Sequence, residues 1–478
     1  MSERMRHGLL LGLVGLVSLA LRLTELSVRP MHADEANQAV KLGELLETGR
    51  YAFDPRDHHG PTLYYAALPV AWLRGRTTLA SLDETTVRLT PVLFGVVSVA
   101  LLWLLAQPLG RWPALAAAAL LAVSPAAIYY SRYFVQETLL VAFTLGALVC
   151  AQRWWRTGLA RWAVAAGACV GLMQATKISA PLLLLAAGLA LLAARPARPT
   201  ASPPALHLAW ALGTALVVAA LFYSSFGTHP AGLRDAFTAY GHAFARGSGE
   251  SGHDKPWWYY LSFFGVQRSG GVPWGEPALA VLALAGLVVA AVTRNTFLRW
   301  SAVYAVTVVV LFSLPAYKTP WHNVHFAPAL ALLGAGALAA LPGWRSAAGL
   351  LAAVLALQLW QVRLAVYRYP ADQRNPFAYV HSSPDVLKYR PLAAAALARA
   401  PAGAVRVISE EYWPLPWYFR GLPRTGYWNT PPADCDGALI ITSTTQAAAV
   451  RARLHGRYRE SFLGLRPGVI CVLFTPEP

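Results

Sequence analysis

The chain has 478 residues, of which 56% are hydrophobic and 13% are charged. This apolar content exceeds what a soluble globular chain needs for its core, so the composition predicts a polytopic α-helical membrane protein. The formal net charge of +17 comes from basic residues spread over many loops. Because they are not gathered on one face, we expect no nucleic-acid partner.

About eleven apolar stretches come close to the roughly 17 to 25 residues with which a helix crosses a bilayer, and ten to thirteen spans stay open. The first stretch follows Arg4 and Arg6 as a secretory signal would, but no small-x-small cleavage site follows it, so we expect it to remain as an anchor. The predicted spans cover residues 8–24, 86–107, 112–129, 134–151, 160–176, 179–194, 204–223, 276–293, 297–316, 323–341 and 346–366.

Basic residues set the expected orientation of the spans. With the N-terminus inside, the inner segments contain many arginines, and Glu3 is the only acid among them. This bias is typical of cytoplasmic loops and holds for every alternate loop. We therefore expect a multi-pass protein of the plasma (inner) membrane, with a cytoplasmic N-terminus and an extracytoplasmic C-terminal region. The inner arginines are Arg4, Arg6, Arg111, Arg153, Arg156, Arg161, Arg195, Arg198, Arg294, Arg299 and Arg345.

Two outer pieces fall in the transmembrane module, which we expect to cover residues 1–369. The first, 25–85, contains an amphipathic segment at 35–49 and an apolar segment at 61–73 that is too short to span, so both predict helices lying on the outer surface. The second, 224–275, predicts a lid. Its Trp257 suits either the membrane interface or stacking on a sugar ring.

The C-terminal region 370–478 predicts a small extracytoplasmic α/β domain. Short apolar runs at 405–408, 438–441 and 469–473 favour buried strands, and alanine-rich stretches at 392–400 and 446–454 favour helices. Cys435 and Cys471 both fall in this domain, where they form either a disulfide or two free buried thiols.

Ionisable side chains are almost absent from the span centres and gather at their outer ends. Carboxylates suit a general base, and lysine or arginine suits a leaving phosphate. Three structural alternatives stay open: Asp34 and Glu35 beginning a helix, an Arg132–Glu137 ion pair, and a Lys177 that snorkels. The outer groups are Asp34, Glu35, Arg132, Glu137, Lys177, Lys318, His322 and His325.

Four motifs in this order resemble the GT-C superfamily of membrane glycosyltransferases, over roughly residues 1–345. The motifs are the outer Asp34-Glu35 pair, Ser131-Arg-Tyr-Phe-Val-Gln-Glu-Thr138, Gly171-Leu-Met-Gln-Ala-Thr-Lys177 and Tyr317-Lys-Thr-Pro-Trp-His322. Within it the chain is most similar to the aminoarabinose-transferase and protein O-mannosyltransferase-like enzymes (glycosyltransferase family 39-like) and to flippase-activity-associated proteins. The segment His59–Tyr65 also resembles that family's Pro-rich juxtamembrane helix.

The resemblance implies transfer of a sugar from a polyprenyl-phosphate donor to a lipid, glycan or protein acceptor on the extracytoplasmic face. It implies Asp34 as the catalytic acid-base group and Glu137 as a second acidic position, beside Glu35. For the donor phosphate it implies Lys177 and Lys318, to which we add Arg132 and Tyr133. We assign the acceptor, sugar or lid to His58, His59, His253, Trp257 and His322.

Two further matters stay open. A divalent cation, Mg²⁺ or Mn²⁺, held by Asp34 with His32 or His59 is an alternative to a metal-free reaction. A lipid-sugar flippase or a non-catalytic scaffold of a glycan-assembly complex is an alternative to a transferase. A flippase needs a polar route through the bilayer, and the apolar centres of the spans argue against one.

Overall fold

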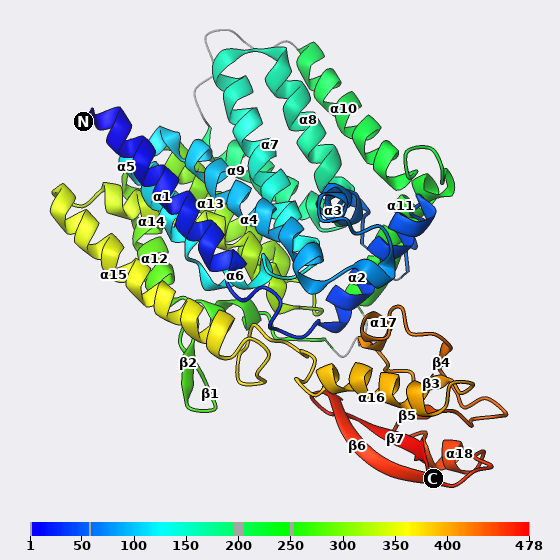
Figure 1. Cartoon of the computed structure of the whole chain (residues 1–478). Helices are drawn as coiled ribbons and strands as arrows, with labels where there is room; N and C mark the ends of the chain where they lie inside the picture. Colours follow the sequence, from blue (N-terminus) through cyan, green and yellow to red (C-terminus); the bar gives the residue numbers. More distant parts are fainter. Residues whose placement is uncertain (1, 57–58, 196–204, 249–252, 478) are drawn as a thin grey trace.

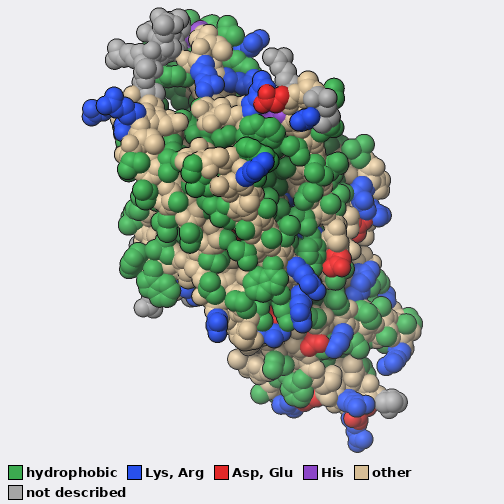
Figure 2. All heavy atoms as spheres, turned by 90° about the vertical axis from the view of Figure 1, so that its left-hand side faces the viewer, with side chains coloured by type: hydrophobic (Ala, Val, Ile, Leu, Met, Phe, Trp, Pro, Cys, Tyr) green, Lys and Arg blue, Asp and Glu red, His purple; other side chains and the backbone are tan. Residues whose placement is uncertain are grey.

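The computed structural model describes residues 2–56, 59–195, 205–248 and 253–477. Long helices form one bundle, and a small sheet domain lies beyond one of its ends (Figure 1). The beginning of the first helix lies at the opposite end of the bundle from this domain. On the face shown in Figure 2, hydrophobic side chains cover much of the helical part, and many charged side chains lie above and below them.

Each predicted span overlaps a helix of the structure. Among the described residues six helices are long and apolar enough to cross a membrane, namely α1, α4, α7, α10, α13 and α15 continued by the π-helical turn η5. The chain is therefore a multi-pass membrane protein. The bundle helices are α1 (Glu3–Leu23), α4 (Glu84–Leu105), α5 (Arg111–Ala122), α7 (Glu137–Thr157), α8 (Ala160–Gln174), α9 (Ala180–Ala194), α10 (Ala205–Tyr223), α12 (Pro277–Val292), α13 (Thr296–Ser313), α14 (Ala327–Ala339), α15 (Trp344–Val362) and η5 (Arg363–Arg368).

Glycines on α8 allow α10 to pack closely against it. A Cβ atom on Gly167 would lie 2.1 Å from the carbonyl oxygen of Ala211, and one on Gly171 would lie 2.5 Å from that of Ala215. Such small residues let two helix backbones approach in a membrane, where apolar burial alone gives little attraction between helices. No residue in the apolar window of α10 is buried, so this helix lies on the outside of the bundle.

Short helices and turns cover the end of the bundle that faces the C-terminal domain. Helix α3 has 12 residues, and its position at a membrane interface stays a prediction. The segment 224–275 contains a helix, a 3-10 turn and a hairpin, so much of it is regular structure. These elements are α2 (Ala33–Thr48), α3 (Thr62–Leu73), η1 (Leu79–Ser81), α6 (Pro125–Tyr130), α11 (Ala231–Ser248), η3 (Tyr259–Phe263), β1 (Gln267–Ser269), β2 (Val272–Trp274) and η4 (Pro320–His325). The turn η2 (Gln107–Leu109) instead connects α4 to α5 at the other end of the bundle.

The C-terminal domain contains a mixed five-stranded sheet with the strand order β4-β3-β5-β7-β6. Strand β3 is parallel to β4 and β5, whereas β7 is antiparallel to β5 and β6. The three predicted strands are present, and β4 and β6 are additional. Its elements are α16 (Val386–Arg399), β3 (Val405–Ile408), α17 (Leu415–Tyr418), β4 (Thr425–Trp428), β5 (Leu439–Ser443), α18 (Ala447–Arg451), β6 (Tyr458–Arg466) and β7 (Val469–Pro476).

The two cysteines of this domain are not bridged. Cys435 and Cys471 are both buried and free, so the disulfide alternative is wrong. The thiol of Cys435 instead donates to the carbonyl oxygen of Pro432 at 3.4 Å. Burial raises the pKa of both thiols, which keeps them protonated.

Polar contacts hold the C-terminal domain against the start of α2 and α4. The amide of Met31 donates to the hydroxyl of Tyr418 at 2.9 Å, and the hydroxyl of Ser382 donates to the carbonyl oxygen of Met31 at 2.7 Å. The indole nitrogen of Trp417 donates to Glu84 at 2.7 Å. The domain therefore reaches the helix that carries Asp34.

Candidate active site

Helix α2 begins with a capping box that places Asp34 in its first turn. His32 is the N-cap residue. Its Nδ1 accepts from the Asp34 amide at 3.1 Å, while the Glu35 carboxylate accepts from the His32 amide at 3.3 Å. Asp34 is exposed, and within the described part of the chain no hydrogen bond or ion pair engages its carboxylate. Asp34 is therefore a carboxylate available to another molecule.

Glu35, by contrast, is fully engaged inside the protein. Its two oxygens accept from Arg88 at 2.6 and 2.9 Å, and it also accepts from Arg29 at 3.3 Å and from the Phe134 amide at 3.1 Å. Burial alone would raise its pKa, but the arginine charges and these hydrogen bonds lower the pKa of Glu35 to about 2. The buried carboxylate fixes α2 in place, and this position does not favour the predicted catalytic role.

Lys177 and Glu137 form a buried ion pair between the end of α8 and the start of α7. Their exposed fractions are 4% and 2%, so neither side chain extends to the surface. Two structural alternatives are thus wrong: Lys177 does not snorkel, and Glu137 does not pair with Arg132. Lysine binds phosphate as well as carboxylate groups, so this position is chemically compatible with a phosphate partner.

Histidines surround this ion pair. His322 on η4 is hydrogen-bonded through Nδ1 to the hydroxyl of Tyr260 at 2.8 Å. Burial and then the positive charge of Lys177 lower the pKa of His322 well below its usual range, with smaller contributions from His325 and His59. His322 is therefore neutral near pH 7, and these groups share one neighbourhood.

Backbone contacts place His59 beside Lys177. The Gly60 amide donates to the carbonyl oxygen of Thr176 at 3.1 Å, and the hydroxyls of Thr62 and Thr176 are 2.7 Å apart. A Cβ on Gly60 would lie 2.1 Å from the carbonyl oxygen of Ala175, so only glycine permits this approach. The other predicted histidine of this segment, His58, lies outside the described residues.

A pair of amides links the Asp34 helix to the Lys177 pair. The Nε2 atom of Gln136 donates to Oε1 of Gln38 at 3.0 Å, and the Tyr64 hydroxyl donates to the same oxygen. Gln38 lies one helical turn after Asp34, where residues four apart share a face with Cβ atoms about 5 to 6 Å apart. Gln136 directly precedes Glu137. A series of hydrogen bonds and sequence neighbours, through Gln38, Gln136 and Glu137, therefore connects the Asp34 helix to Lys177.

A second group gathers at Asp34 from the other side. The backbone oxygen of Tyr379 accepts from Nε2 of His32 at 3.1 Å, and the Tyr379 hydroxyl is 2.9 Å from Nδ1 of His253. The rings of His32 and Trp321 are 6.0 Å apart. Burial lowers the pKa of His253, and the nearby carboxylate of Asp34 opposes this shift.

Three residues that were predicted to bind the donor phosphate with Lys177 have other partners in the structure. Arg132 donates to the carbonyl oxygens of Arg22 and Glu25, both at 3.0 Å, and so caps the end of α1. The Tyr133 ring lies 3.4 Å below the Arg29 guanidinium. These positions do not join Lys177.

The ammonium group of Lys318 is likewise bound by the protein itself and is not open to a phosphate. It is 1% exposed and donates to the carbonyl oxygens of Lys255 and Pro315. Burial lowers its pKa. Trp257, in contrast, is 68% exposed, which is compatible with the predicted membrane interface.

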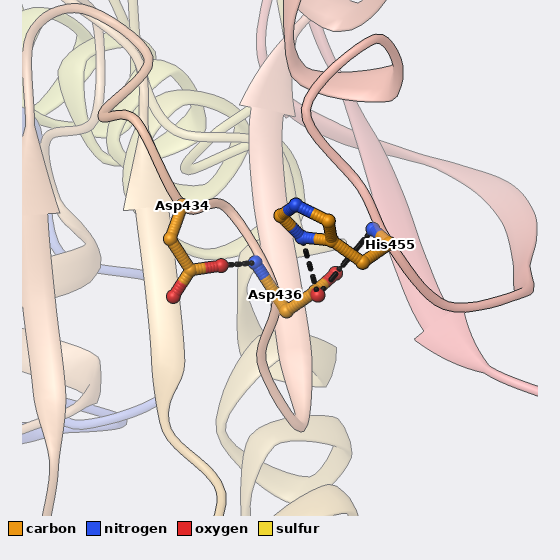
Figure 3. A group of neighbouring side chains, drawn as sticks. All are labelled: Asp434, Asp436 and His455. Atoms are coloured by element: carbon orange, nitrogen blue, oxygen red, sulfur yellow. Dashed lines mark hydrogen bonds and ion pairs between the residues drawn. The ribbon is translucent and has the colours of Figure 1, made fainter.

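Of the metal ligands left open above, His32 is poorly placed to bind a cation. Both ring nitrogens of His32 are hydrogen-bonded. Within the described ranges, three potential ligands converge only at Asp434, Asp436 and His455 in the C-terminal domain (Figure 3). There Asp436 accepts from Nδ1 of His455 at 3.1 Å, and Asp434 pairs with Arg406 at 2.9 Å, so these groups stabilise a loop.

The residues that were not anticipated are Gln38, Gln136, Trp321 and Tyr379. A sequence signal exists for Gln38, because it lies four residues after Asp34 on the same helical face. Gln136 and Trp321 lie next to predicted site residues. Tyr379 gives no such signal, since it lies 347 residues after His32, with which it forms a hydrogen bond.

Comparison with known proteins supports the GT-C resemblance. A family model described as dolichyl-phosphate-mannose-protein mannosyltransferase matches residues 66–223. No curated protein matches the chain by sequence. The crystal structure of ArnT from Cupriavidus metallidurans bound to undecaprenyl phosphate is similar, with 15% identity and a TM-score of 0.69 over 99% of this chain and 98% of that one.

Two larger enzymes share the fold. The Archaeoglobus fulgidus oligosaccharyltransferase tethered with an acceptor peptide has 15% identity and a TM-score of 0.53, over 97% of this chain and 74% of that one. The mycobacterial arabinofuranosyltransferase AftD has 15% identity and a TM-score of 0.53, over 100% of this chain and 40% of that one. The chain has the fold that these membrane glycosyltransferase structures share, and the expected fold is confirmed.

Proposed function

We propose that this protein is a membrane glycosyltransferase that moves a sugar from a polyprenyl-phosphate donor to an acceptor on the extracytoplasmic face, with Asp34 as general base. One observation carries the proposal: the unengaged carboxylate of Asp34 is linked through Gln38 and Gln136 to the buried Lys177–Glu137 pair. The similar ArnT structure holds undecaprenyl phosphate, which supports a lipid phosphate as the donor.

The two ends of this arrangement have complementary chemistry. The acceptor attacks the sugar through an oxygen or nitrogen atom, and Asp34 takes the proton that this atom loses. Such general base catalysis typically contributes a factor of about 10² to 10⁴ in rate. The bond from the sugar to the lipid phosphate breaks, and Lys177 stabilises the charge that develops on the phosphate. For this the phosphate replaces Glu137 as the partner of Lys177.

The topology supports an extracytoplasmic site. Arginine-rich loops predict that the beginning of α1 is cytoplasmic. Helix α2, which carries Asp34, lies at the other end of the bundle, beside the C-terminal domain. Because each predicted span corresponds to a helix, we infer about eleven membrane spans. We assign the protein to the plasma (inner) membrane.

The test is sugar transfer by purified Asp34→Asn protein in detergent or proteoliposomes, with undecaprenyl phosphates carrying different sugars as donors. We expect a loss of at least about 10² in rate with an unchanged melting temperature. Glu44→Gln, an exposed carboxylate on the same helix, is the matched control. Full activity of Asp34→Asn contradicts the proposal.

The alternatives predict different results in the same preparation. A flippase moves the labelled lipid across proteoliposomes without transferring sugar, and a scaffold does neither. The series of hydrogen bonds between the Asp34 helix and the Lys177–Glu137 pair supports a transferase over a scaffold, because a scaffold has no need to connect an exposed carboxylate to a buried lysine.

A further inference from the structure

We propose that a small monovalent anion such as chloride binds in a cavity inside the helical bundle, against the guanidinium group of Arg22 on α1. The cavity lies among α1, α4, α5, α6 and α7, and its lining includes Arg22, Gly95, Ser98 and Thr138. None of these side chains belongs to the proposed transfer site. The inference therefore does not depend on the proposed function.

Arg22 is a buried charge without a counter-charge. It is 1% exposed, and within the described part of the chain no carboxylate forms an ion pair with it. Its Nη1 atom donates to the carbonyl oxygens of Ser18 and Ala122, both at 3.1 Å, and to the Ser18 hydroxyl at 2.7 Å. Because arginine stays charged and a buried charge is costly unless it is paired, such a residue in a membrane-spanning helix points to a missing partner.

The neighbouring groups at the end of α1 do not supply the missing charge. Arg132 brings a second guanidinium group, which donates to the carbonyl oxygens of Arg22 and Glu25. The Glu25 side chain itself is exposed and pairs with neither arginine. Carbonyl oxygens carry only partial negative charge, so an anion beside Arg22 would offset a positive charge that the described side chains leave unbalanced.

One nitrogen of the Arg22 guanidinium is open to a ligand. Nη2 has no hydrogen bond among the described residues, yet it is not among the unpartnered polar atoms that are closed to a water-sized molecule, as Nε is. Nε instead packs against Gly95, where an added Cβ would lie 2.8 Å from it. Because Arg22 and Gly95 both line the cavity, we place Nη2 at its surface.

The size of the cavity and its hydroxyl groups suit one small anion. Its volume is about 20 Å³. A single water needs about 10 to 15 Å³, so there is no room for a phosphate or a sugar. The hydroxyls of Ser98 and Thr138 donate to the carbonyl oxygens of Phe94 and Tyr130, at 2.8 and 3.3 Å, and can rotate towards an anion. A water would fill the same space but would leave the charge of Arg22 unbalanced.

The experiment measures thermal unfolding of the full-length protein in detergent. The protein is first held in sodium gluconate, and chloride or bromide then replaces gluconate at constant ionic strength. We expect either halide to raise the melting temperature by about 3 to 5 °C, with saturation. Crystals grown in bromide should show an anomalous scattering peak in the cavity beside Arg22.

Two variants should lose or weaken this response. Arg22→Met should abolish the halide-dependent rise. Ser98→Ala, a milder change, removes one donor and should raise the half-saturating halide concentration about threefold or more. Ser301→Ala is the matched control, because Ser301 is also a buried serine whose hydroxyl donates to the carbonyl oxygen four residues earlier, but it does not line the cavity.

The control should keep the full response of the unmodified protein. The proposal is overturned if the unmodified protein shows no halide-dependent rise, or if Arg22→Met and Ser98→Ala show the same rise at the same halide concentrations. A cavity that holds only water in the bromide crystals overturns it as well.

Discussion

Arg88 donates from Nε and Nη2 to the two carboxylate oxygens of Glu35, at 2.6 and 2.9 Å, and both side chains are fully buried. This pair joins α4 of the bundle to the first turn of α2. Because Asp34 precedes Glu35 directly, the ion pair fixes the backbone that presents the free carboxylate. The adjacent acids of one motif therefore have different tasks, one facing outward and one holding the helix.

Glu35→Gln should strongly destabilise the protein. Removing one charge leaves Arg88 and Arg29 buried without their carboxylate, and breaking a buried pair in this way costs about 3 to 5 kcal/mol. We expect a clear fall in the detergent melting temperature of the variant. Glu44→Gln breaks an exposed pair with Lys41 on the same helix and should cost less than about 0.5 kcal/mol. Equal melting temperatures for the two variants would contradict this account.

The same carboxylate predicts a pH dependence of stability. The pKa of Glu35 is about 2 in the folded protein, below the value of 4.5 for an unperturbed glutamate. As the pH falls, Glu35 therefore becomes protonated in the unfolded state before it does in the folded state. The stabilisation is fully present above about pH 4.5 and is lost as the pH falls towards 2. Unfolding measured from pH 6 to pH 2.5 should show this loss in the unmodified protein and a flatter curve in Glu35→Gln, whereas parallel curves would disagree with it.

The helices of the bundle could be predicted because a bilayer requires long apolar segments with internal hydrogen bonds. The same constraint acts on every span, so hydropathy locates each helix even where, as for α14 with 13 residues, the regular part is short. Strands β3, β5 and β7 could be predicted from apolar runs. Strands β4 and β6 could not, because they are only partly buried along most of their length.

The candidate site could be predicted only in part, because a motif identifies a residue but not its partners. The carboxylate that binds Lys177 lies 40 residues before it. Arg132 belongs to a recognised motif, yet its guanidinium caps the carbonyl groups of α1. Whether an arginine meets a backbone or a ligand depends on tertiary packing, and this information is not local in the sequence.

Gly167→Ala should weaken the attachment of α10. The added methyl would lie 2.1 Å from the carbonyl oxygen of Ala211, so the helices must separate, at a cost of about 1 to 3 kcal/mol. Gly213→Ala is a matched control on α10, since nothing lies within 4 Å of its added Cβ. Thermal unfolding should distinguish the variants, and cysteine cross-links between α8 and α10 should form more slowly only in Gly167→Ala. Similar effects of both substitutions would argue against the close contact.

Tyr379→Phe should loosen the segment that begins at His253. The variant keeps the ring and loses the hydroxyl that is 2.9 Å from His253 Nδ1, a hydrogen bond that stabilises by about 1 kcal/mol. We expect faster amide hydrogen exchange in residues 253–260 while the C-terminal sheet stays protected. Tyr389→Phe removes a hydroxyl that donates to Leu463 within the C-terminal domain, so it should act on the sheet instead. Unchanged exchange at 253–260 would show that Tyr379 does not position this segment.

Glu137→Gln should increase the affinity for undecaprenyl phosphate. In the free protein the Glu137 carboxylate neutralises Lys177, so a phosphate must displace it before it can bind. The amide leaves a buried lysine without a counter-charge, and a phosphate that restores one should bind about tenfold more tightly. Lys177→Met should abolish this binding, and so should the Glu137→Gln/Lys177→Met double variant, because the gain acts through the lysine. Native mass spectrometry at low and high salt measures all four proteins. An affinity that is unchanged or lower in Glu137→Gln would mean that the phosphate does not exchange with Glu137 at Lys177.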